Sequence, residues 1–448
     1  MEALHKREER GKRRTFNKMN TRRKLMKRVL LAAAAFAALA TVAATSTKAE
    51  EMTLRVHYSI PNLWSEIKQK LATEFMARNP DIKIELDAPE ETYAKGVQRL
   101  LRESVGGQAP DLAFVGLNRW RILEDRGLTV ELDSFIGDDA AFEKAGYTPA
   151  LRSLGQYKGE QHALAVSAST LVMYVNPDLV EQADGYMDDF PTDFDGLIAL
   201  AAKINNLGNN IDGVWIAAHD WRFQSMLGSY GGRPMNEDET AITFDSDAGV
   251  KAAELYFRFA KEAGMKGYDG NAARQAFAAG TLGIYIDSSS YLTRMMEGAG
   301  DRFEVTLLPN IVASEDKSTV YFPTGGSAIV MLTEDAAKQQ AAWEYIQFVT
   351  GPDGAKIIVE NSGYAPTNAI VLQDESYLGA FYANNPNAKR AHAQVASYAG
   401  PWYAYPGAEG VAVTDLIAAA LVEVVEGADP DTKINEVADD VRSKLDMQ

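Results

Sequence analysis

The chain of 448 residues contains no cysteine. A chain without cysteine has no disulfide framework, no thiolate nucleophile and no zinc–thiolate site, and it offers no cysteine for a lipid anchor. Its stability must therefore come from the size of its apolar core. At this length a large core is available, and more than one domain is expected.

Histidine is also scarce, and local catalytic motifs are missing. The chain has 5 histidines, and none of those after residue 50 lies three or four positions from another. There is no H-E-x-x-H, G-x-S-x-G, P-loop, G-x-G-x-x-G or EF-hand pattern. We therefore expect no catalytic residues, no metal and no cofactor. Catalytic groups can also be assembled from distant residues, so a secreted glycan-acting hydrolase stays open as an alternative of another class.

The first 49 residues differ from the rest. Basic residues crowd the first 28, and an apolar or small run follows from Val29 to Ala44. This pattern predicts a signal peptide over 1–49, cleaved near Ala49. Export through the Sec or the twin-arginine route, and a start at Met19 or Met26, remain open. Because no later apolar stretch approaches the roughly 18 residues of a membrane span, we expect a soluble periplasmic protein.

Basic residues are few once this leader is removed. The leader holds 13 of the 45 Lys and Arg and 3 of the 62 Asp and Glu, which leaves 32 and 59 and a net charge of −27. A surface this acidic repels nucleic acid and anionic lipid. Neither is expected as a partner.

After the leader, strand and helix patterns alternate. The expected strands are 54–58, 82–86 and 112–115, and the expected helices begin with 63–75, 93–104 and 117–126. Such repeated units predict an α/β fold with a doubly wound, mostly parallel sheet. Further helices are expected at 195–206, 248–263, 271–279, 336–350, 353–361, 414–426 and 434–445.

The stretch from Gly159 to Pro177 predicts a crossing between two lobes. It is too long for one strand, and its middle, Ser167–Thr170, is small and hydroxyl-rich. We expect two short strands joined by a polar hinge. Similar junctions are expected at Asp287–Ser290 and Gly325–Ser327, as a hinge of several segments requires. The expected lobes are 50–167 with 286–331 (N-terminal) and 168–285 with 332–448 (C-terminal).

Aromatic and hydroxyl residues at loops and hinges are the positive functional signal. Aromatic faces bind the C–H surfaces of sugars, and such sites are typical of clefts between domains. Trp221 follows an apolar strand, and Trp402 lies in a loop rich in proline and glycine. Trp221 is equally explained as a core residue, and Ser288 and Ser289 as turn residues. We favour ligand contact for Trp402.

Several motifs, weak one by one, occur in a characteristic order. They are Ala109–Leu112 (APDL), Tyr174–Asp178 (YVNPD), Tyr230–Gly232 (YGG), Thr243–Val250 (TFDSDAGV) and Phe277–Gly280 (FAAG). In this order the chain resembles the extracellular solute-binding protein family 1, the periplasmic proteins that serve ABC importers. The resemblance covers essentially all of 50–448. It implies the two-lobed periplasmic binding protein fold, with no catalysis and a monomeric state.

The segments Asn361–Thr367 and Phe381–Pro386 are most similar to the glycerol-3-phosphate-binding branch of that family. By position, the resemblance implies ligand contacts at Tyr93, Ser169, Ser288 or Ser289, Gly326 and Tyr364. It also places Asn118 where maltose-binding relatives have a sugar-binding Asp, and His57 and Tyr58 in a loop that opens on the cleft.

One departure from that branch bears on the ligand. The branch has an arginine before its penultimate helix, where this chain reads Tyr403–Glu409 with no basic residue. A bidentate arginine is the usual clamp for phosphate. We therefore expect a neutral sugar, oligosaccharide or polyol, delivered to the permease subunits of an ABC transporter. Glycerol 3-phosphate or a glycerophosphodiester remains the alternative ligand, with Arg222 or Arg233 as possible substitutes for the missing arginine.

Overall fold

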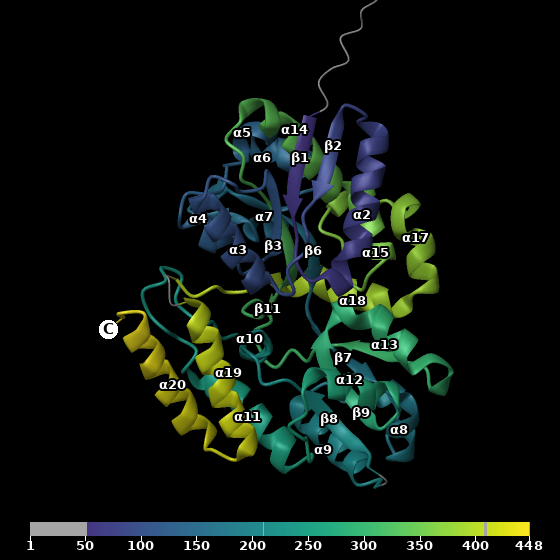
Figure 1. The fold of residues 1–448 in the computed structure, drawn as a ribbon. Helices are drawn as coiled ribbons and strands as arrows, with labels where there is room; N and C mark the ends of the chain where they lie inside the picture. Colours follow the sequence, from purple (N-terminus) through teal and green to yellow (C-terminus); the bar gives the residue numbers. More distant parts are fainter. Residues whose placement is uncertain (1–51, 209, 407–409, 448) are drawn as a thin grey trace, which may run out of the picture. The chain divides into compact units, whose positions relative to one another are not determined.

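The computed structural model describes residues 52–208, 210–406 and 410–447. The expected signal peptide and its cleavage point lie outside these ranges. Two larger β-sheets, each covered by helices, organise the described residues (Figure 1). We call the parts built on them the first and the second lobe. Within the described residues, no helix is long and apolar enough to cross a membrane.

The first lobe contains a five-stranded sheet in the order β2-β1-β3-β12-β6. Strand β1 runs parallel to β2 and β3, whereas β12 runs antiparallel to β3 and β6. Helices α2, α3, α14 and α15 pack against this sheet. The bounds are β1 Met52–His57, α2 Pro61–Arg78, β2 Ile82–Leu86, α3 Tyr93–Val105, β3 Leu112–Gly116, β6 Ala163–Ser169, β12 Gly325–Met331, α14 Ala336–Thr350 and α15 Pro352–Glu360.

The second lobe contains a four-stranded sheet in the order β10-β7-β9-β8, in which only β8 and β9 pair in parallel. Each sheet is nevertheless mostly parallel in strand direction, as expected, because a single strand runs against the others: β12 in the first sheet and β7 in the second. The bounds are β7 Leu171–Val175, α8 Pro177–Gln182, α9 Phe194–Asn205, β8 Asp212–Ile216, α10 Asp220–Ser229, α11 Asp247–Lys261, α12 Gly270–Ala278, β9 Leu282–Ser288, α13 Leu292–Ala299 and β10 Thr306–Pro309.

Short elements fill the connections between these units. In the first lobe they are α4 Trp120–Glu124, α5 Asp133–Ile136, α6 Asp139–Lys144, α7 Pro149–Ser153, β4 Gln156–Tyr157 and β5 Glu160–Gln161. The helix expected over 117–126 is thus limited to α4. Strands β11 Phe322–Pro323 and β13 Ala399–Gly400 pair in parallel, and short 3₁₀ turns span Met187–Asp189, Ser289–Tyr291 and Gly300–Arg302.

The chain first crosses between the lobes at a single residue, Thr170. Strand β6 ends at Ser169 in the first sheet, and β7 begins at Leu171 in the second. The expected pair of short strands with a polar hinge is therefore confirmed. Both strands are fully buried, as is typical of strands covered on both faces.

The other connections differ from expectation. Strand β9 stays paired with β7 as far as Ser288, so the chain does not leave the second sheet at Asp287–Ser290. It returns to the first lobe only after β10, through β11 to β12. Helices α14 and α15 then pack on the first lobe, not the second. The divisions expected at 285/286 and 331/332 differ from this arrangement. Strands β9 and β10 stay in the second sheet, and α14 and α15, which follow β12, pack on the first lobe.

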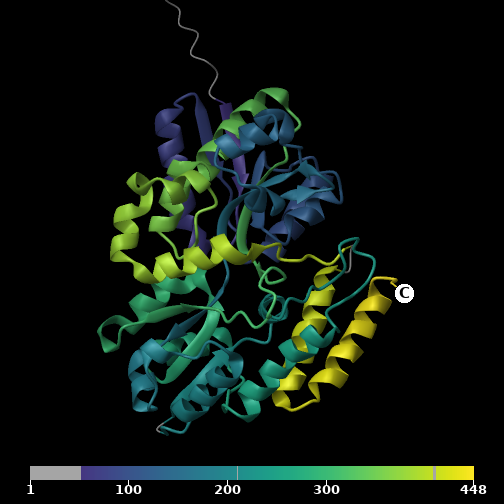
Figure 2. The same cartoon turned by 180° about the vertical axis from the view of Figure 1, so that it is seen from behind.

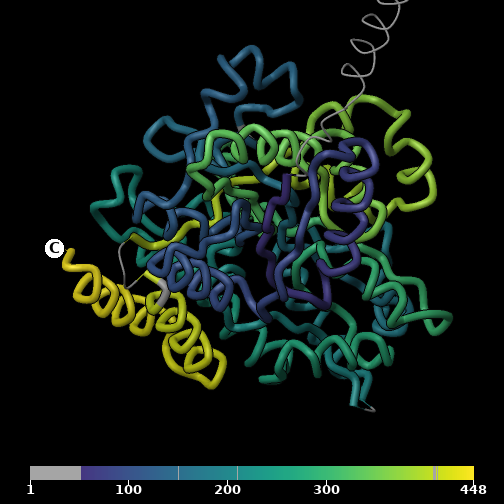
Figure 3. Tube along the Cα trace, turned by 45° about the horizontal axis from the view of Figure 1, so that its top comes forward, coloured from purple at the N-terminus to yellow at the C-terminus, as the bar shows by residue number. Residues whose placement is uncertain are grey.

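The C-terminal part forms a helical layer. Its helices are α16 Ala369–Gln373, α17 Glu375–Asn384, α18 Pro386–Tyr398, α19 Gly410–Glu426 and α20 Pro430–Lys444. Helix α18 contacts both β6 and β10, and Figure 2 shows it running between the lobes. Helices α19 and α20 pack on each other and on α11, at one side of the second lobe (Figure 3).

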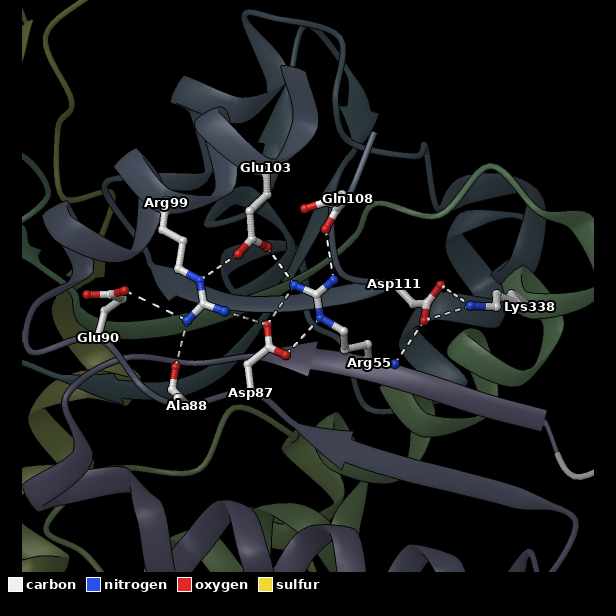
Figure 4. Close-up of polar contacts among 9 residues, drawn as sticks. All are labelled: Arg55, Asp87, Ala88, Glu90, Arg99, Glu103, Gln108, Asp111 and Lys338. Carbon is white, nitrogen blue, oxygen red and sulfur yellow. Dashed lines mark hydrogen bonds and ion pairs between the residues drawn. The ribbon is translucent and has the colours of Figure 1, made fainter. Parts of the chain in front are cut away.

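An ion-pair network fixes α3 against β1 (Figure 4). Arg55 on β1 contacts Asp87 at 2.8 Å and Glu103 on α3 at 2.6 Å, and Arg99 contacts Glu103 at 2.7 Å. Burial opposes ionisation of Glu103, but the bonds from Arg99 and Arg55 hold its pKa below the ordinary value. Because α3 begins at Tyr93, the network also positions that side chain.

Candidate ligand-binding site

Two serines meet where the sheets join. Ser169 ends β6 and Ser288 ends β9, and their hydroxyl oxygens lie 3.0 Å apart. Gly325 pairs with Ser169 across the first sheet. A Cβ at Gly325 would lie 3.0 Å from Ser169 Oγ and 3.2 Å from Trp221 Cζ2. The absence of a side chain there lets Trp221 of the second lobe approach the hinge.

The first lobe contributes a group of aromatic residues. Trp64 Nε1 donates to the Tyr93 hydroxyl at 3.1 Å, and the Trp64 ring stacks on Tyr364 with centroids 5.2 Å apart. Burial raises the pKa of Tyr93 to about 12, against hydrogen bonds that include one from Ser327. The hydroxyl of Tyr364 also bonds Ser290 of the second lobe. The Ser290 and Ser288 hydroxyl oxygens lie 2.9 Å apart. Three expected contact residues, Tyr93, Tyr364 and Ser288, are thus linked by hydrogen bonds.

Charged and aromatic side chains from both lobes meet at the start of α10. Asp220 is buried, and its carboxylate accepts hydrogen bonds from Gln224 and, at 3.4 Å, from Trp402 Nε1. Burial raises the pKa of Asp220 to about 6, against those bonds and the charge of Arg119, which lower it. The rings of Trp221 and Trp402 lie 6.1 Å apart. Asp220 therefore bonds Trp402 and interacts electrostatically with a cation of the first lobe.

A cavity of 530 Å³ opens beside Trp402. Residues of both lobes line it, and the Arg121–Glu239 ion pair crosses between them, with Nη2 and Oε2 2.6 Å apart. The lining includes aromatic faces, acidic groups and neutral polar groups: Leu117, Trp120, Arg121, Ser153, Leu154, Gln156, Tyr157, Lys158, Glu237, Asp238, Glu239 and Pro401–Ala404. This combination suits a ligand with both C–H surfaces and hydroxyls.

The expected contact residues differ in their surroundings. Trp402 lines the cavity, and Asn118 lies beside Tyr93 around Gly116, with its buried Oδ1 unpaired among the described residues. Ser289 is fully buried, and its hydroxyl likewise has no partner there. Tyr58 is buried and bonds Ser65 at 3.1 Å, so this contact does not join it to the groups above.

Gly326 has a backbone role. Its φ is +131°, and a Cβ would lie 2.0 Å from the Ser167 carbonyl oxygen. The position therefore requires glycine for packing between β12 and β6. Ligand contact at Gly326 stays a prediction, as it does for the other expected contact residues.

Sequence reasoning missed Arg119, Arg121, Asp220 and Glu239. Arg119 and Arg121 lie within five residues of the end of β3 at Gly116. Ligands of open α/β sheets bind beyond the carboxyl ends of strands. That rule was available from the sequence, whereas the position of Glu239 depends on the packing of a distant loop. Within the described residues, no group of three or more His, Asp or Glu side chains is placed to hold a metal ion.

The two-lobed arrangement, with polar groups of both lobes around a cavity, is the fold of the periplasmic binding proteins. Residues 70–390 match the model of the bacterial extracellular solute-binding proteins, and the chain belongs to that family. The resemblance read from the sequence is confirmed at the family level. Members of this family are binding proteins rather than enzymes.

Individual relatives are more distant. The chain is 24% identical to a maltotriose-binding protein of Pyrococcus abyssi over 312 residues, covering 69% of this chain and 65% of the relative. Its fold is similar to UgpB of Mycobacterium tuberculosis in complex with glycerophosphocholine (TM-score 0.76, 21% identity, 87% and 98% covered). It is also similar to the GacH receptor of Streptomyces glaucescens, solved unliganded and with acarbose (TM-score 0.74, 20% identity, 89% and 100% covered).

Proposed function

We propose that residues 50–448 act as the periplasmic receptor of an ABC importer. The receptor captures a carbohydrate between its lobes and delivers it unchanged to the permease subunits in the inner membrane. It works as a monomer, after removal of the signal peptide. Family membership and the maltotriose-binding relative support this proposal.

The observation that carries the proposal is the lining of the cavity between the lobes. Tyr157, Trp402 and Tyr403 supply aromatic faces from both sides, and Gln156 and Asp238 supply polar groups. A second cavity of 660 Å³ shares Glu237, Glu239, Pro401 and Tyr403 with the first. Two spaces that meet at one wall favour a ligand of more than one sugar unit.

A phosphate-bearing ligand is less favoured in this cavity. Arg222 pairs with Asp287 at 2.5 Å, and Arg233 lies over the Tyr321 ring and lines only the second cavity. Arg121 already bonds Glu239 with both of its terminal nitrogens. Arg222 and Arg121 are therefore neutralised by carboxylates, whereas Lys158 of the lining lies over the Tyr157 ring. With two of these cations neutralised, we favour a neutral, hydroxyl-rich ligand.

The test is titration calorimetry of the mature chain with neutral oligosaccharides, sugars and polyols. Trp402→Ala should weaken binding by roughly 30-fold, or about 2 kcal/mol, as expected for loss of a central aromatic contact. Tyr186→Ala is the matched control, because Tyr186 is an exposed aromatic outside the cavity. Equal affinity of the Trp402→Ala variant, or recovery of a cleaved ligand, contradicts the proposal; cleavage indicates the hydrolase alternative.

A further inference from the structure

A separate cavity of 390 Å³ lies on the second lobe, between helices α12 and α13. It shares no lining residue with the two cavities beside the loop at Trp402. Two arginines and two residues with side-chain amides are among its lining residues, which are Asn271, Arg274, Gln275, Ala278, Arg294 and Met295. No carboxylate is among these lining residues.

Both guanidinium groups bond neutral acceptors. Arg294 Nη2 donates to the backbone oxygen of Asn62 at 2.6 Å. Arg274 donates to the Tyr285 hydroxyl at 3.5 Å and to the Asn271 side-chain oxygen. Within the described parts of the chain, neither arginine forms an ion pair with a carboxylate.

Two carboxylates that interact electrostatically with Arg274 already have other partners. Asp287 pairs with Arg222 and accepts a bond from the Tyr285 hydroxyl at 2.5 Å. Asp269 caps α12, since its Oδ1 accepts from two backbone N–H groups at 2.7 and 3.0 Å. The positive charge of the cavity is therefore only partly balanced by its surroundings.

A third positive feature adjoins Arg294. Its partner Asn62 lies in the first turn of α2, a helix of 18 residues. That helix has no acidic residue in its first turn and no side-chain cap at Ile60. The positive end of its dipole therefore adds to the charge of Arg294 rather than reducing it.

We propose that the α12–α13 cavity binds a small oxyanion, of which inorganic phosphate is the simplest. The planar forks of Arg274 and Arg294 match the oxygens of a tetrahedral anion, and the amides of Asn271 and Gln275 add donors. This site is independent of carbohydrate binding. Its anion is either a free ion or the phosphate end of a larger solute.

The test compares thermal unfolding and calorimetric titration of the mature chain in phosphate and in chloride at equal ionic strength. Phosphate should raise the melting temperature in a saturable way. Arg274→Gln and Arg294→Gln should each weaken phosphate binding at least tenfold. Arg274→Lys keeps the charge without the fork and should have an intermediate effect. Arg78→Gln is the control, because it removes a surface arginine paired with Asp353.

The outcomes separate the possible sources of the anion. Tighter binding of glycerol 3-phosphate than of inorganic phosphate assigns the site to a solute, whereas equal binding assigns it to the free ion. A phosphate effect that survives both glutamine substitutions, or no effect beyond that of chloride, overturns the proposal. Neutral-sugar binding, measured on the same variants, should not change. If the unsubstituted chain binds no neutral sugar, that result counts against the carbohydrate proposal and leaves the oxyanion proposal unaffected.

Discussion

The Arg121–Glu239 ion pair should stabilise the closed arrangement of the lobes. Arg121 belongs to α4 of the first lobe, and Glu239 lies in the loop between Met235 and Ile242 of the second. The contact is bidentate, and the side chains are only 17% and 24% exposed. Glu239 also has a left-handed backbone, with φ of 56°, which a glutamate adopts rarely.

The size of the effect follows from this partial burial. Hydrogen bonds to charged groups contribute about 1.5–3 kcal/mol, whereas exposed ion pairs contribute about 0–1 kcal/mol. An intermediate coupling of about 1–2 kcal/mol is expected, which corresponds to roughly a 5- to 30-fold shift of the closing equilibrium. The coupling should fall as salt is added.

The assay uses the absence of native cysteine. Cysteines introduced at Val105 of the first lobe and Tyr186 of the second, which are 92% and 71% exposed, accept a pair of labels at unique sites. The label distance is then measured for Arg121→Gln, Glu239→Gln and the double variant. Each single change should populate a longer distance, and the double change should add little. Additive single effects, with no coupling between the two sites, would refute this reasoning.

Two further predictions concern stability. Gly326→Ala should lower the free energy of unfolding by at least about 2 kcal/mol, because its Cβ would lie 2.0 Å from the Ser167 oxygen at a φ of +131°. Gly267→Ala, with open space around it, is the control in the same denaturant titration, and equal losses would contradict the steric argument. Acid should also destabilise the fold, because burial lowers the pKa of three histidines to about 4, 4 and 3 (His57, His219 and His392). The unfolded chain takes up these protons below about pH 6.5, whereas the folded chain takes them up only near pH 4 or 3, so this stability is complete above pH 6.5 and is lost progressively as the pH falls to those values. The loss is roughly 3 kcal/mol each for His57 and His219 and roughly 5 kcal/mol for His392. A free energy of unfolding that stays constant from pH 7.5 to 4.5 would rule this out.

The sequence predicts local features well because they depend on neighbouring residues. The hydroxyl-rich break before Thr170 correctly marked a change of sheet, and α14 spans the expected 336–350. Helix α19 was expected from 414 and begins at Gly410, since apolar periodicity alone does not define a helix start. Two lobes and the family were also within reach of the sequence.

Contacts between distant residues could not be predicted in the same way. Asp287–Ser290 has the same polar character as the crossing at Thr170, yet pairing with β7 keeps β9 in the second sheet. Nothing local to Asp220 indicates that Trp402 and Arg119 approach it. Such a site depends on how the lobes pack, and a pattern along one segment contains no information about its partners.

The place of β12 in the sequence has a consequence for how the protein is made. This strand lies between β3 and β6, yet it is encoded by residues 325–331, long after Ser169. At about 5–20 residues per second, a ribosome needs roughly 8–30 s to go from the end of β6 to the start of β12. During that interval the nascent first lobe lacks a central strand and cannot close its sheet. The first lobe therefore completes its sheet only after the strands of the second lobe, β7 to β10, have been made.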